Sequence, residues 1–269
     1  MLNTITQLTG ATVSATDGDI GHVSSAFFDD QTWTVRYLVV NAGSWLTDRE
    51  VLISPYSVNG PQGTASYIGV ALSREQVKNS PDIDTHQPVS RQHERDFLGY
   101  YAYPPYWGGD ALWGVSAYPY NAPPMPEAAR LALDRAMHQR DVDAGDVHLR
   151  SSARVIGYEI KASDESIGHV QDFVFDEENW AIRYLVVDTR NWWPGGRKVL
   201  ISVLWIEAID WATQQVQVNL TREQIKASPE YDGVASIRRD YEARLHQAYK
   251  RPGYWGDEVA VAQVTAVVR

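Results

Sequence analysis

Two histidines in one repeated motif are the first residues of this chain that could do chemistry. His22 and His169 each occupy the third position of an Ile-Gly-His-Val sequence. An imidazole ring can ligate a metal ion or transfer a proton near neutral pH. A metal site needs several converging ligands, however, and the motif supplies one histidine in each copy. We therefore favour a structural role, in which each ring hydrogen-bonds from its strand to backbone.

Two acidic clusters, at 29–30 and 176–178, could hold a hard cation through their carboxylate oxygens. Neither cluster fits the twelve-residue pattern of a calcium loop. Because acidic turns between strands are usually solvated, we expect these carboxylates to face water.

Arg36 and Arg183 interrupt otherwise apolar segments at equivalent positions. As functional groups they would bind an anion. We favour the alternative, in which the aliphatic stem packs on the protein and the guanidinium pairs with a nearby carboxylate.

The rest of the composition excludes several classes of site. The chain has no cysteine, which rules out thiolate nucleophiles, disulfides and cysteine-ligated metals. The sequence also lacks a phosphate-binding loop, a dinucleotide fingerprint, a His-Glu-x-x-His motif and a nucleophile elbow. A net charge of −10 argues against nucleic acid or anionic lipid as a partner, since both are bound through positive charge. We expect no cofactor, no metal and no enzymatic activity.

Tryptophan and tyrosine supply the best candidates for a binding surface. The chain has 10 Trp and 15 Tyr but only 5 Phe, and Trp and Tyr concentrate at interaction hot spots. The candidate interaction surface comprises Trp45, Tyr106, Trp107, Trp192, Trp193, Tyr254 and Trp255. The adjacent tryptophans precede a Pro-Gly-Gly turn and are the strongest candidates for exposure. For the two Tyr-Trp pairs we slightly favour packing back onto their own modules.

These residues recur because the chain is internally duplicated. When residues 20–40 are aligned with 167–187, 12 of 21 positions are identical without a gap. The offset of 147 residues becomes 148 after one inserted residue, and the match continues to a Tyr-Trp-Gly element in each copy. The duplicated positions with a predicted structural role are Gly21, His22, Trp33, Arg36, Tyr37, Gly168, His169, Trp180, Arg183 and Tyr184.

Each copy is predicted to form short strands followed by helices. Alternating apolar residues, and runs that are apolar on both faces, predict five or six strands per copy. So many short strands favour a small closed barrel, because closure removes exposed sheet edges. The predicted strands are 11–16, 20–28, 33–40, 51–53 and 67–70 in the first copy, with 180–187, 199–201 and 214–220 among those of the second.

Helix signals follow the strands. Ser73 and Thr221 each stand three positions before a glutamine, which is the capping-box pattern at the start of a helix. Apolar residues at helical spacing predict a further helix over Ser236–Tyr249. The remaining predictions are an ordered aromatic coil over 100–126, a helix over 127–140 and a β-strand over 259–268.

The predicted domains follow the repeat. They are a first unit at 1–108, a linker with a helix at 109–150 and a second unit at 151–269. No stretch of about 18 uncharged apolar residues could span a bilayer, and the first residues lack the regions of a signal peptide. We therefore expect a soluble cytoplasmic protein without intrinsic membrane insertion.

The assembled motifs resemble the PRC-barrel family. Its units carry a Gly-His/Lys-Val strand, an aspartate-rich turn, a Trp-x-Val-Arg-Tyr-Leu-Val-Val strand and a Val-Leu-Ile-Ser/Pro strand. In this chain the last two motifs stand at Trp33–Val40 and Val51–Ser54, and again at Trp180–Val187 and Val199–Ser202. The family is similar to the cytoplasmic domain of the photosynthetic reaction-centre H subunit and to a domain of a ribosome maturation factor. The resemblance implies a mainly β protein with accessory helices and two small barrels in tandem.

The resemblance implies docking on other macromolecules and no common reaction. We expect a non-enzymatic protein-interaction or assembly module that binds a protein partner or self-associates, with any small-molecule ligand left open. The alternative is a peripheral subunit of a membrane photosynthetic or electron-transfer complex, resembling the H subunit. An uncharacterised hydrolase or metal-dependent enzyme ranks last, because it needs carboxylates and histidines that converge in one pocket.

Overall fold

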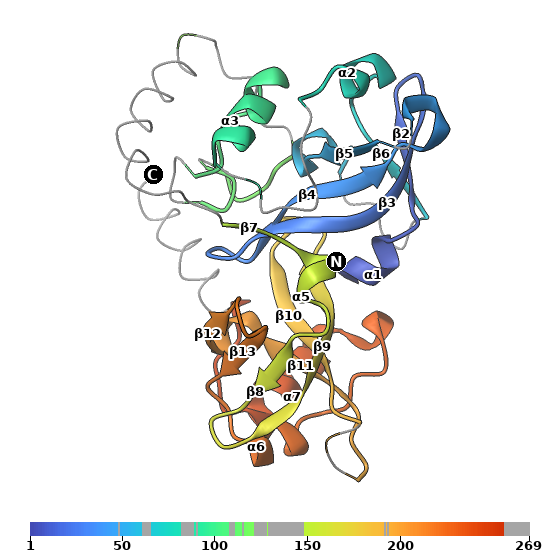
Figure 1. Ribbon diagram of the computed structural model, residues 1–269. Coiled ribbons are helices and arrows are strands. Elements are labelled where there is room, and N and C mark those ends of the chain that lie inside the picture. Colours follow the sequence, from blue (N-terminus) through green and yellow to red (C-terminus); the bar gives the residue numbers. More distant parts are fainter. Residues whose placement is uncertain are drawn as a thin grey trace, which may run out of the picture. The chain divides into compact units, whose positions relative to one another are not determined.

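Two β-sheets dominate the described part of the computed structural model (Figure 1), so the protein is mainly β with accessory helices, as expected. The structure describes residues 1–47, 49–60, 66–81, 89, 91–107, 111–114, 116–120, 128, 148–190, 192 and 194–255. The chain divides into two compact units. Unit 1 is Met1–Ile156 together with Asp172–Arg183, and unit 2 is Gly157–Gln171 together with Tyr184–Arg269. Segment 172–183 thus belongs to the second sequence copy but to unit 1.

The sheet of the first copy has the strand order β5-β4-β3-β2-β6, and β7 also pairs with β3. Its strands are β2 (Thr12–Ala15), β3 (Gly18–Asp29), β4 (Thr34–Asn41), β5 (Glu50–Ile53), β6 (Tyr67–Gly69) and β7 (Leu149–Ser151). Paired strands are antiparallel except β2 and β6, which are parallel. Every residue of β4 except the last is buried, which confirms the predicted burial of both faces at Leu38–Val40 and extends it to the start of the strand.

The second sheet repeats this plan with the strand order β11-β10-β9-β8-β13-β12, and β1 also pairs with β9. Its strands are β1 (Leu2–Thr4), β8 (Glu159–Lys161), β9 (Ser166–Asp176), β10 (Ile182–Asp188), β11 (Lys198–Ser202), β12 (Ile206–Asp210) and β13 (Gln215–Val218). The pair β8 and β13 is parallel, like β2 and β6.

Neither sheet closes on itself within the described ranges, because each strand order is an open path. The closed barrel expected from the sequence is therefore corrected to two open sheets. One physical reason is visible after β5, where the chain enters the 3-10 helix η2 (Pro55–Ser57). Pro55 has no backbone N–H to donate to a further ladder, so the edge strand ends there.

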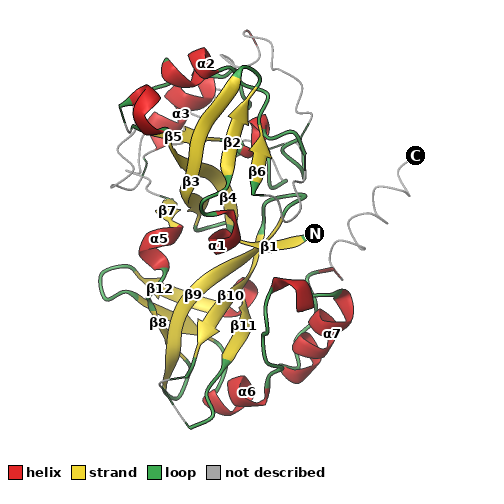
Figure 2. Ribbon diagram, turned by 90° about the vertical axis from the view of Figure 1, so that its right-hand side faces the viewer, coloured by secondary structure: helices red, strands yellow, loops and turns green. Residues whose placement is uncertain are grey.

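Six helices flank the sheets within the described residues. They are α1 (Ile5–Leu8), α2 (Arg74–Lys78), α3 (Arg91–Tyr100), α5 (Ser152–Val155), α6 (Arg222–Ala227) and α7 (Arg239–Ala248). Helix α7 lies inside the predicted range and packs on the sheet of unit 2 (Figure 2), where its Glu242 and His246 contact Tyr184 of β10. The helix predicted at 127–140, apart from residue 128, and the strand predicted at 259–268 lie outside the described residues. In the part of the chain that is described, no helix has the length and apolar character needed to cross a membrane.

Both predicted capping boxes are present. Ser73 Oγ accepts the backbone N–H of Gln76 at 3.2 Å, and Gln76 Oε1 accepts the backbone N–H of Ser73 at 2.8 Å. Thr221 and Gln224 form the same reciprocal pair at 3.3 and 2.8 Å. These bonds satisfy backbone donors that the first helical turn leaves unpaired, so they set where α2 and α6 begin.

Replacing Thr221 with alanine is expected to lower the free energy of unfolding by about 1 kcal/mol. The backbone N–H of Gln224 loses its acceptor, whereas Thr221→Ser keeps a hydroxyl and serves as the control. Thermal unfolding of the two variants measures the difference. Equal melting temperatures for Thr221→Ala and Thr221→Ser would contradict the role of this cap.

Unit 1 contains a reciprocal exchange of short strands between the two sequence copies. Strand β1 opens the first copy and pairs with β9 of the second, with Leu2 opposite Asp176. Strand β7 opens the second copy and pairs with β3 of the first, with Leu149 opposite Asp29. All four of these positions are related by the offset of 147 residues, so each copy donates the same strand to the same place in the other. Figure 2 shows β1 beside β9.

The reciprocity extends to the strand starts beside the two tryptophans. Val35 N–H donates to the carbonyl of Trp180 at 2.9 Å, and Ile182 N–H donates to the carbonyl of Trp33 at 2.6 Å. Both tryptophans adopt left-handed backbone conformations, with φ of 50° for Trp33 and 61° for Trp180. A non-glycine residue adopts this conformation at an energetic cost, so surrounding contacts must stabilise it. The equivalent contacts are self-complementary, as in the interface of a twofold-symmetric dimer.

Candidate interaction site

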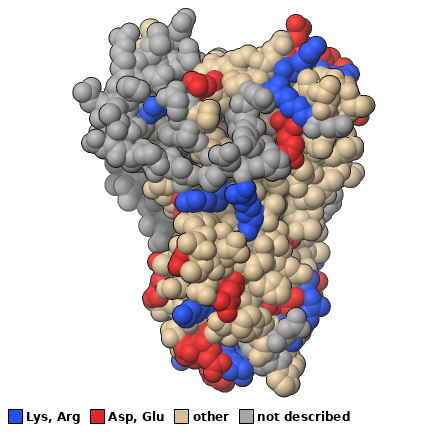
Figure 3. Space-filling view, viewed as in Figure 1, with Lys and Arg blue, Asp and Glu red and all other residues tan. Residues whose placement is uncertain are grey.

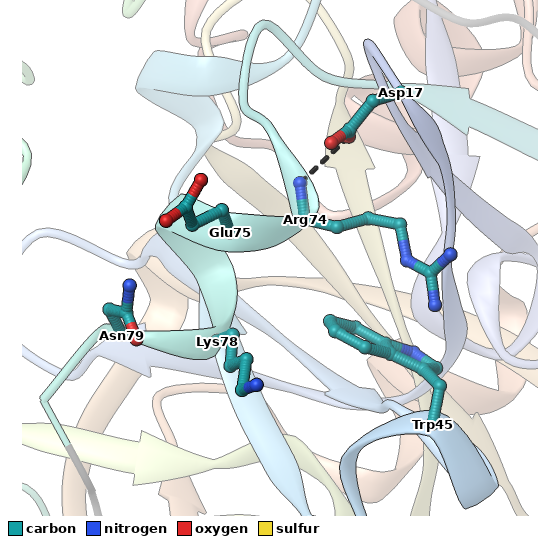
Figure 4. A pocket seen from close by; sticks show the side chains of 6 residues that line it. All are labelled: Asp17, Trp45, Arg74, Glu75, Lys78 and Asn79. Carbon is teal, nitrogen blue, oxygen red and sulfur yellow. Dashed lines mark hydrogen bonds between the residues drawn. The ribbon is translucent and has the colours of Figure 1, made fainter.

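The groove beside Trp45 is the candidate interaction site. It has a volume of about 390 Å³ and is lined by Asp17, Trp45, Arg74, Glu75, Lys78 and Asn79. The turn between β2 and β3 supplies the aspartate, and the 3-10 helix η1 (Gly43–Leu46) supplies the tryptophan. Helix α2 and the residue after it supply the other four side chains (Figure 4). Local elements of unit 1 therefore build the whole groove.

Two contacts fix the half-buried indole of Trp45. Its ring N–H donates to the backbone carbonyl of Ile20 at 2.6 Å. The guanidinium carbon of Arg74 lies 4.3 Å from the centroid of the indole ring (Figure 4), which is within the range of a cation–π interaction. The backbone N–H of Arg74 also donates to Asp17 Oδ1 at 2.8 Å. Aromatic ring and guanidinium are thus held together at the groove wall.

The second copy builds the corresponding corner differently. The backbone N–H of Arg222 donates to Asp164 at 2.9 Å, matching the backbone contact of Arg74. The Arg222 guanidinium, however, forms an ion pair with Glu165. The first copy has Gly18 at the position of this glutamate. The two copies therefore share a backbone framework and differ in whether a carboxylate neutralises the arginine.

Charges of both signs surround α2. Figure 3 shows basic and acidic side chains next to one another in this part of unit 1. Lys78 and Glu75 are exposed on the helix, and Asp17 is exposed on the neighbouring turn. The groove is therefore a local mixed-charge feature and not part of a broad basic surface.

The other predicted interaction residues differ in exposure. Trp192 is exposed in unit 2, at 36 %, while Trp193 lies outside the described residues. Tyr106 and Tyr254 are buried, and the tryptophans that follow them, Trp107 and Trp255, are half-buried. The two tyrosines pack inside their own units and present no exposed ring.

Tyr106 belongs to a buried hydrogen-bond cluster in unit 1. The carboxylate of Glu94 accepts the hydroxyl of Tyr37 at 3.2 Å and that of Tyr106 at 2.6 Å. Burial, and then the adjacent Glu94 charge, raises the pKa of Tyr37 far above its usual value. The tyrosine therefore remains a hydrogen-bond donor. The Arg36 guanidinium lies 3.7 Å from the centre of the Tyr106 ring and adds a cation–π contact.

Tyr254 belongs to the equivalent cluster in unit 2. Glu242 Oε1 accepts the hydroxyl groups of Tyr184 and Tyr254, each at 2.8 Å. Arg239 lies 3.3 Å from the other carboxylate oxygen. His246, which replaces Leu98 of the first copy, adds a contact of 3.1 Å from its Nε2 to the hydroxyl of Tyr184. The cluster holds α7 on β10 through buried polar groups.

Burial fixes the protonation of His246. Its Nδ1 lies 2.7 Å from the backbone carbonyl of Pro252, which can only accept, so Nδ1 carries a proton. The side chain is 2 % exposed, and loss of hydration lowers the pKa of His246 below its ordinary value of 6.5. In the neutral ring Nε2 carries no proton, so the single hydroxyl proton of Tyr184 lies between two acceptors, Nε2 and Glu242 Oε1.

The depressed pKa predicts a pH-dependent stability. The unfolded chain binds a proton at this histidine more readily than the folded chain, so stability is lost as the pH falls below 6.5. One proton limits the slope to about 1.4 kcal/mol per pH unit. His246→Leu, which installs the residue of the first copy, should reduce the slope of unfolding free energy against pH. Parallel curves for the parent and the variant between pH 7.5 and 5.5 would contradict this assignment.

The predicted pairing of the duplicated arginines is confirmed. Arg36 Nη2 lies 3.7 Å from Asp29 Oδ2, and Arg183 Nη2 lies 3.7 Å from Asp176 Oδ2. The Arg36 side chain is 1 % exposed, and that of Arg183 is 13 % exposed. Both guanidinium groups therefore lie in the interior of unit 1, and that of Arg36 is the more deeply buried.

The expectation that the acidic clusters face water is wrong for two of their residues. Asp29 is buried, and its Oδ1 accepts the backbone N–H groups of Gln31 at 2.9 Å and Thr32 at 3.1 Å. Glu177 is also buried and accepts the side-chain amide of Asn3 at 2.7 Å. The reason is that these turns lie where the exchanged strands pair, so their carboxylates bond protein groups in place of water.

The two motif histidines belong to different units. His22 is exposed in unit 1 and its Nδ1 lies 3.4 Å from the Thr12 hydroxyl, so its described partner is a side chain and not the expected backbone. His169 is half-buried in unit 2. Among the residues that the structure describes, no group of three or more His, Asp or Glu side chains is arranged to hold a metal ion.

Sequence reasoning missed the residues that line the groove with Trp45, and it missed Glu94, Glu242 and His246. The sequence did contain a clue to the groove. Arg74 and Arg222 align, but the glutamate that pairs with Arg222 is a glycine in the first copy. Glu94 and Glu242 are also aligned, at the offset of 148, within polar segments where a buried carboxylate has no local signature.

A comparison with family models matches residues 149–225 to the PRC-barrel domain. The matched segment runs from β7 into α6. No curated protein matches the chain. The family resemblance of the second copy is thus confirmed over most of its strands.

Proposed function

We propose that the chain is a non-enzymatic interaction module built from two PRC-type units, and that its partner is a protein or a second copy of the chain. The first copy is assigned to the same family because it repeats the strand order, the parallel strand pair and the capping box of the matched segment. Its sequence identity to the second copy is 12 of 21 positions over the central strands.

One observation carries the functional part of the proposal. The buried carboxylates shared by both copies, Glu94 and Glu242, are each engaged by two tyrosine hydroxyls inside the protein. The groove beside Trp45 instead presents an aromatic ring and charged side chains at the surface. Aromatic and arginine side chains concentrate at protein-binding hot spots, so the exposed groups suit recognition while the buried groups suit packing.

Site-specific photo-crosslinking tests the proposal. A photoreactive amino acid at Lys78, which is exposed in the groove, is expected to yield one discrete cross-linked species in cells. The same substitution at Lys226, the equivalent exposed position of the second copy, is the matched control. Light scattering on the purified chain distinguishes self-association from a different protein partner. A monomeric chain that cross-links at neither position would contradict the proposal.

A further inference from the structure

We propose that the groove of the first copy binds a single carboxylate group on a protein segment, held by the in-plane N–H groups of Arg74. This inference rests on the proposed interaction function and names the chemistry of the partner. Three observations support it: the few contacts of the Arg74 guanidinium within the described residues, the ion pair of the aligned arginine in the second copy, and the balance of charges in the groove.

The Arg74 guanidinium is available to a ligand. Within the described residues its side chain has one partner, the ring of Trp45, at 4.3 Å from the centroid. Its Nε is buried and makes no hydrogen bond in that part of the chain. Stacking uses the face of the guanidinium and leaves the terminal N–H groups in its plane free to donate. Trp45, itself anchored on Ile20, is therefore a positioning residue for this donor.

The second copy pairs the equivalent arginine with a carboxylate. Arg222, which aligns with Arg74, binds the carboxylate of Glu165. At the aligned position the first copy has Gly18, and a β-carbon built there would lie 3.4 Å from Arg74 Cδ and 3.7 Å from its Nη1. The Arg74 side chain thus packs beside a residue that has no side chain, and the carboxylate that pairs with the arginine in the second copy is missing here. In the second copy, the same backbone framework thus holds an arginine against a carboxylate.

The charges that line the groove favour a singly charged ligand. Lys78 adds a second positive charge, and Figure 4 shows it on the side of α2 that faces Trp45. Asp17 and Glu75 bring two negative charges to the same groove. A dianionic phosphate would meet repulsion from both, whereas a carboxylate matches the fork of one guanidinium. The overall charge of −10 also disfavours a highly charged anion.

Binding of short blocked peptides tests the inference. The probes are acetyl-Gly-Phe-Glu-Gly-amide, the same peptide with Gln in place of Glu, and the same peptide with phosphoserine. The readout on the full chain is the NMR signal of the Trp45 indole N–H, assigned by its loss in Trp45→Phe. We expect the Glu peptide to bind with a Kd of about 1 mM or tighter and the Gln peptide to bind at least tenfold more weakly.

Matched variants locate the site. Arg74→Gln should weaken the Glu peptide at least tenfold, while Arg222→Gln, at the aligned position of the second copy, should leave its Kd unchanged. Thermal unfolding of both variants confirms that each remains folded. Equal affinity for the Glu and Gln peptides, equal losses in the two arginine variants, or tighter binding of the phosphoserine peptide would each overturn the inference. If the Glu peptide does not bind but Lys78 gives a discrete cross-link, the carboxylate assignment is wrong and the interaction function is still supported.

Discussion

Gly21→Ala is expected to destabilise the protein by roughly 3–5 kcal/mol, the sum of overpacking and backbone strain. A β-carbon at Gly21 would lie 1.9 Å from the backbone oxygen of Asn41 on the neighbouring strand β4. Because backbone atoms cannot turn aside as a side chain can, β3 and β4 must separate to admit the methyl group. The aligned change Gly168→Ala meets the Asp188 carbonyl oxygen at 2.3 Å and should act in the same way.

Gly10 and Gly157 provide the matched controls for these two changes. They are aligned with each other, and both have positive φ, at 86° and 95°. A β-carbon at either position meets nothing within 4 Å. Alanine there should cost only the backbone term of about 1–2 kcal/mol. Denaturant midpoints measure the four variants, and a Gly21→Ala midpoint equal to that of Gly10→Ala would show that the strands do not approach as closely as described.

Arg36→Ala is expected to cost roughly 3–5 kcal/mol, because it leaves Asp29 as a buried charge without its counter-ion. The guanidinium also packs against two rings, at 3.7 Å from the centre of Tyr106 and 4.8 Å from that of Trp113. It donates to the Leu112 carbonyl at 2.6 Å. The change therefore removes charge pairing and packing at the same place.

A double-mutant cycle separates these contributions. Arg36→Met keeps an aliphatic side chain but leaves the charge of Asp29 without a partner. Combining Arg36→Met with Asp29→Asn removes both charges, a change that is often close to neutral in stability. The double variant should therefore be more stable than Arg36→Met alone. Arg183→Ala is the aligned control and should cost about 1 kcal/mol, since its ion pair with Asp176 is more exposed. If Arg183→Ala and Arg36→Ala have equal effects, burial does not set the cost.

Local sequence patterns predicted much of the fold. The strands β4 and β5 and the helix starts at Ser73 and Thr221 all have signals within a few residues, in side-chain alternation or capping pairs. The pairing of Arg36 with a carboxylate was also predictable, because a charged group in an apolar strand requires a partner.

The exchanged strands could not be predicted in the same way. Leu2–Thr4 and Leu149–Ser151 are three residues long, too short for an alternating pattern, and each pairs with a strand that is distant in sequence. The same exchange explains why the carboxylates at Asp29 and Glu177 are buried although their turns are acidic. Long-range pairing, not local composition, decides the environment of these residues.

The candidate site was predictable only in part. Trp45 was identified from residue type, but its significance depends on its contact with Arg74, whose side chain lies beside Gly18; only the folded chain brings these residues together. Tyr106 and Tyr254 had the same residue-type signal and are buried. An aromatic side chain can serve either role, and the hydrogen-bond partner available to its polar atom decides between them.

The two sequence copies complete each other through reciprocal strands within unit 1. A protease site inserted between residues 139 and 140 allows the folded chain to be cut into one fragment per copy. We predict that the fragments then co-elute as a 1:1 complex with the 30.2 kDa mass of the intact chain, and that they separate only when denatured. Two fragments that separate under native conditions, each folded and monodisperse, would contradict the claim.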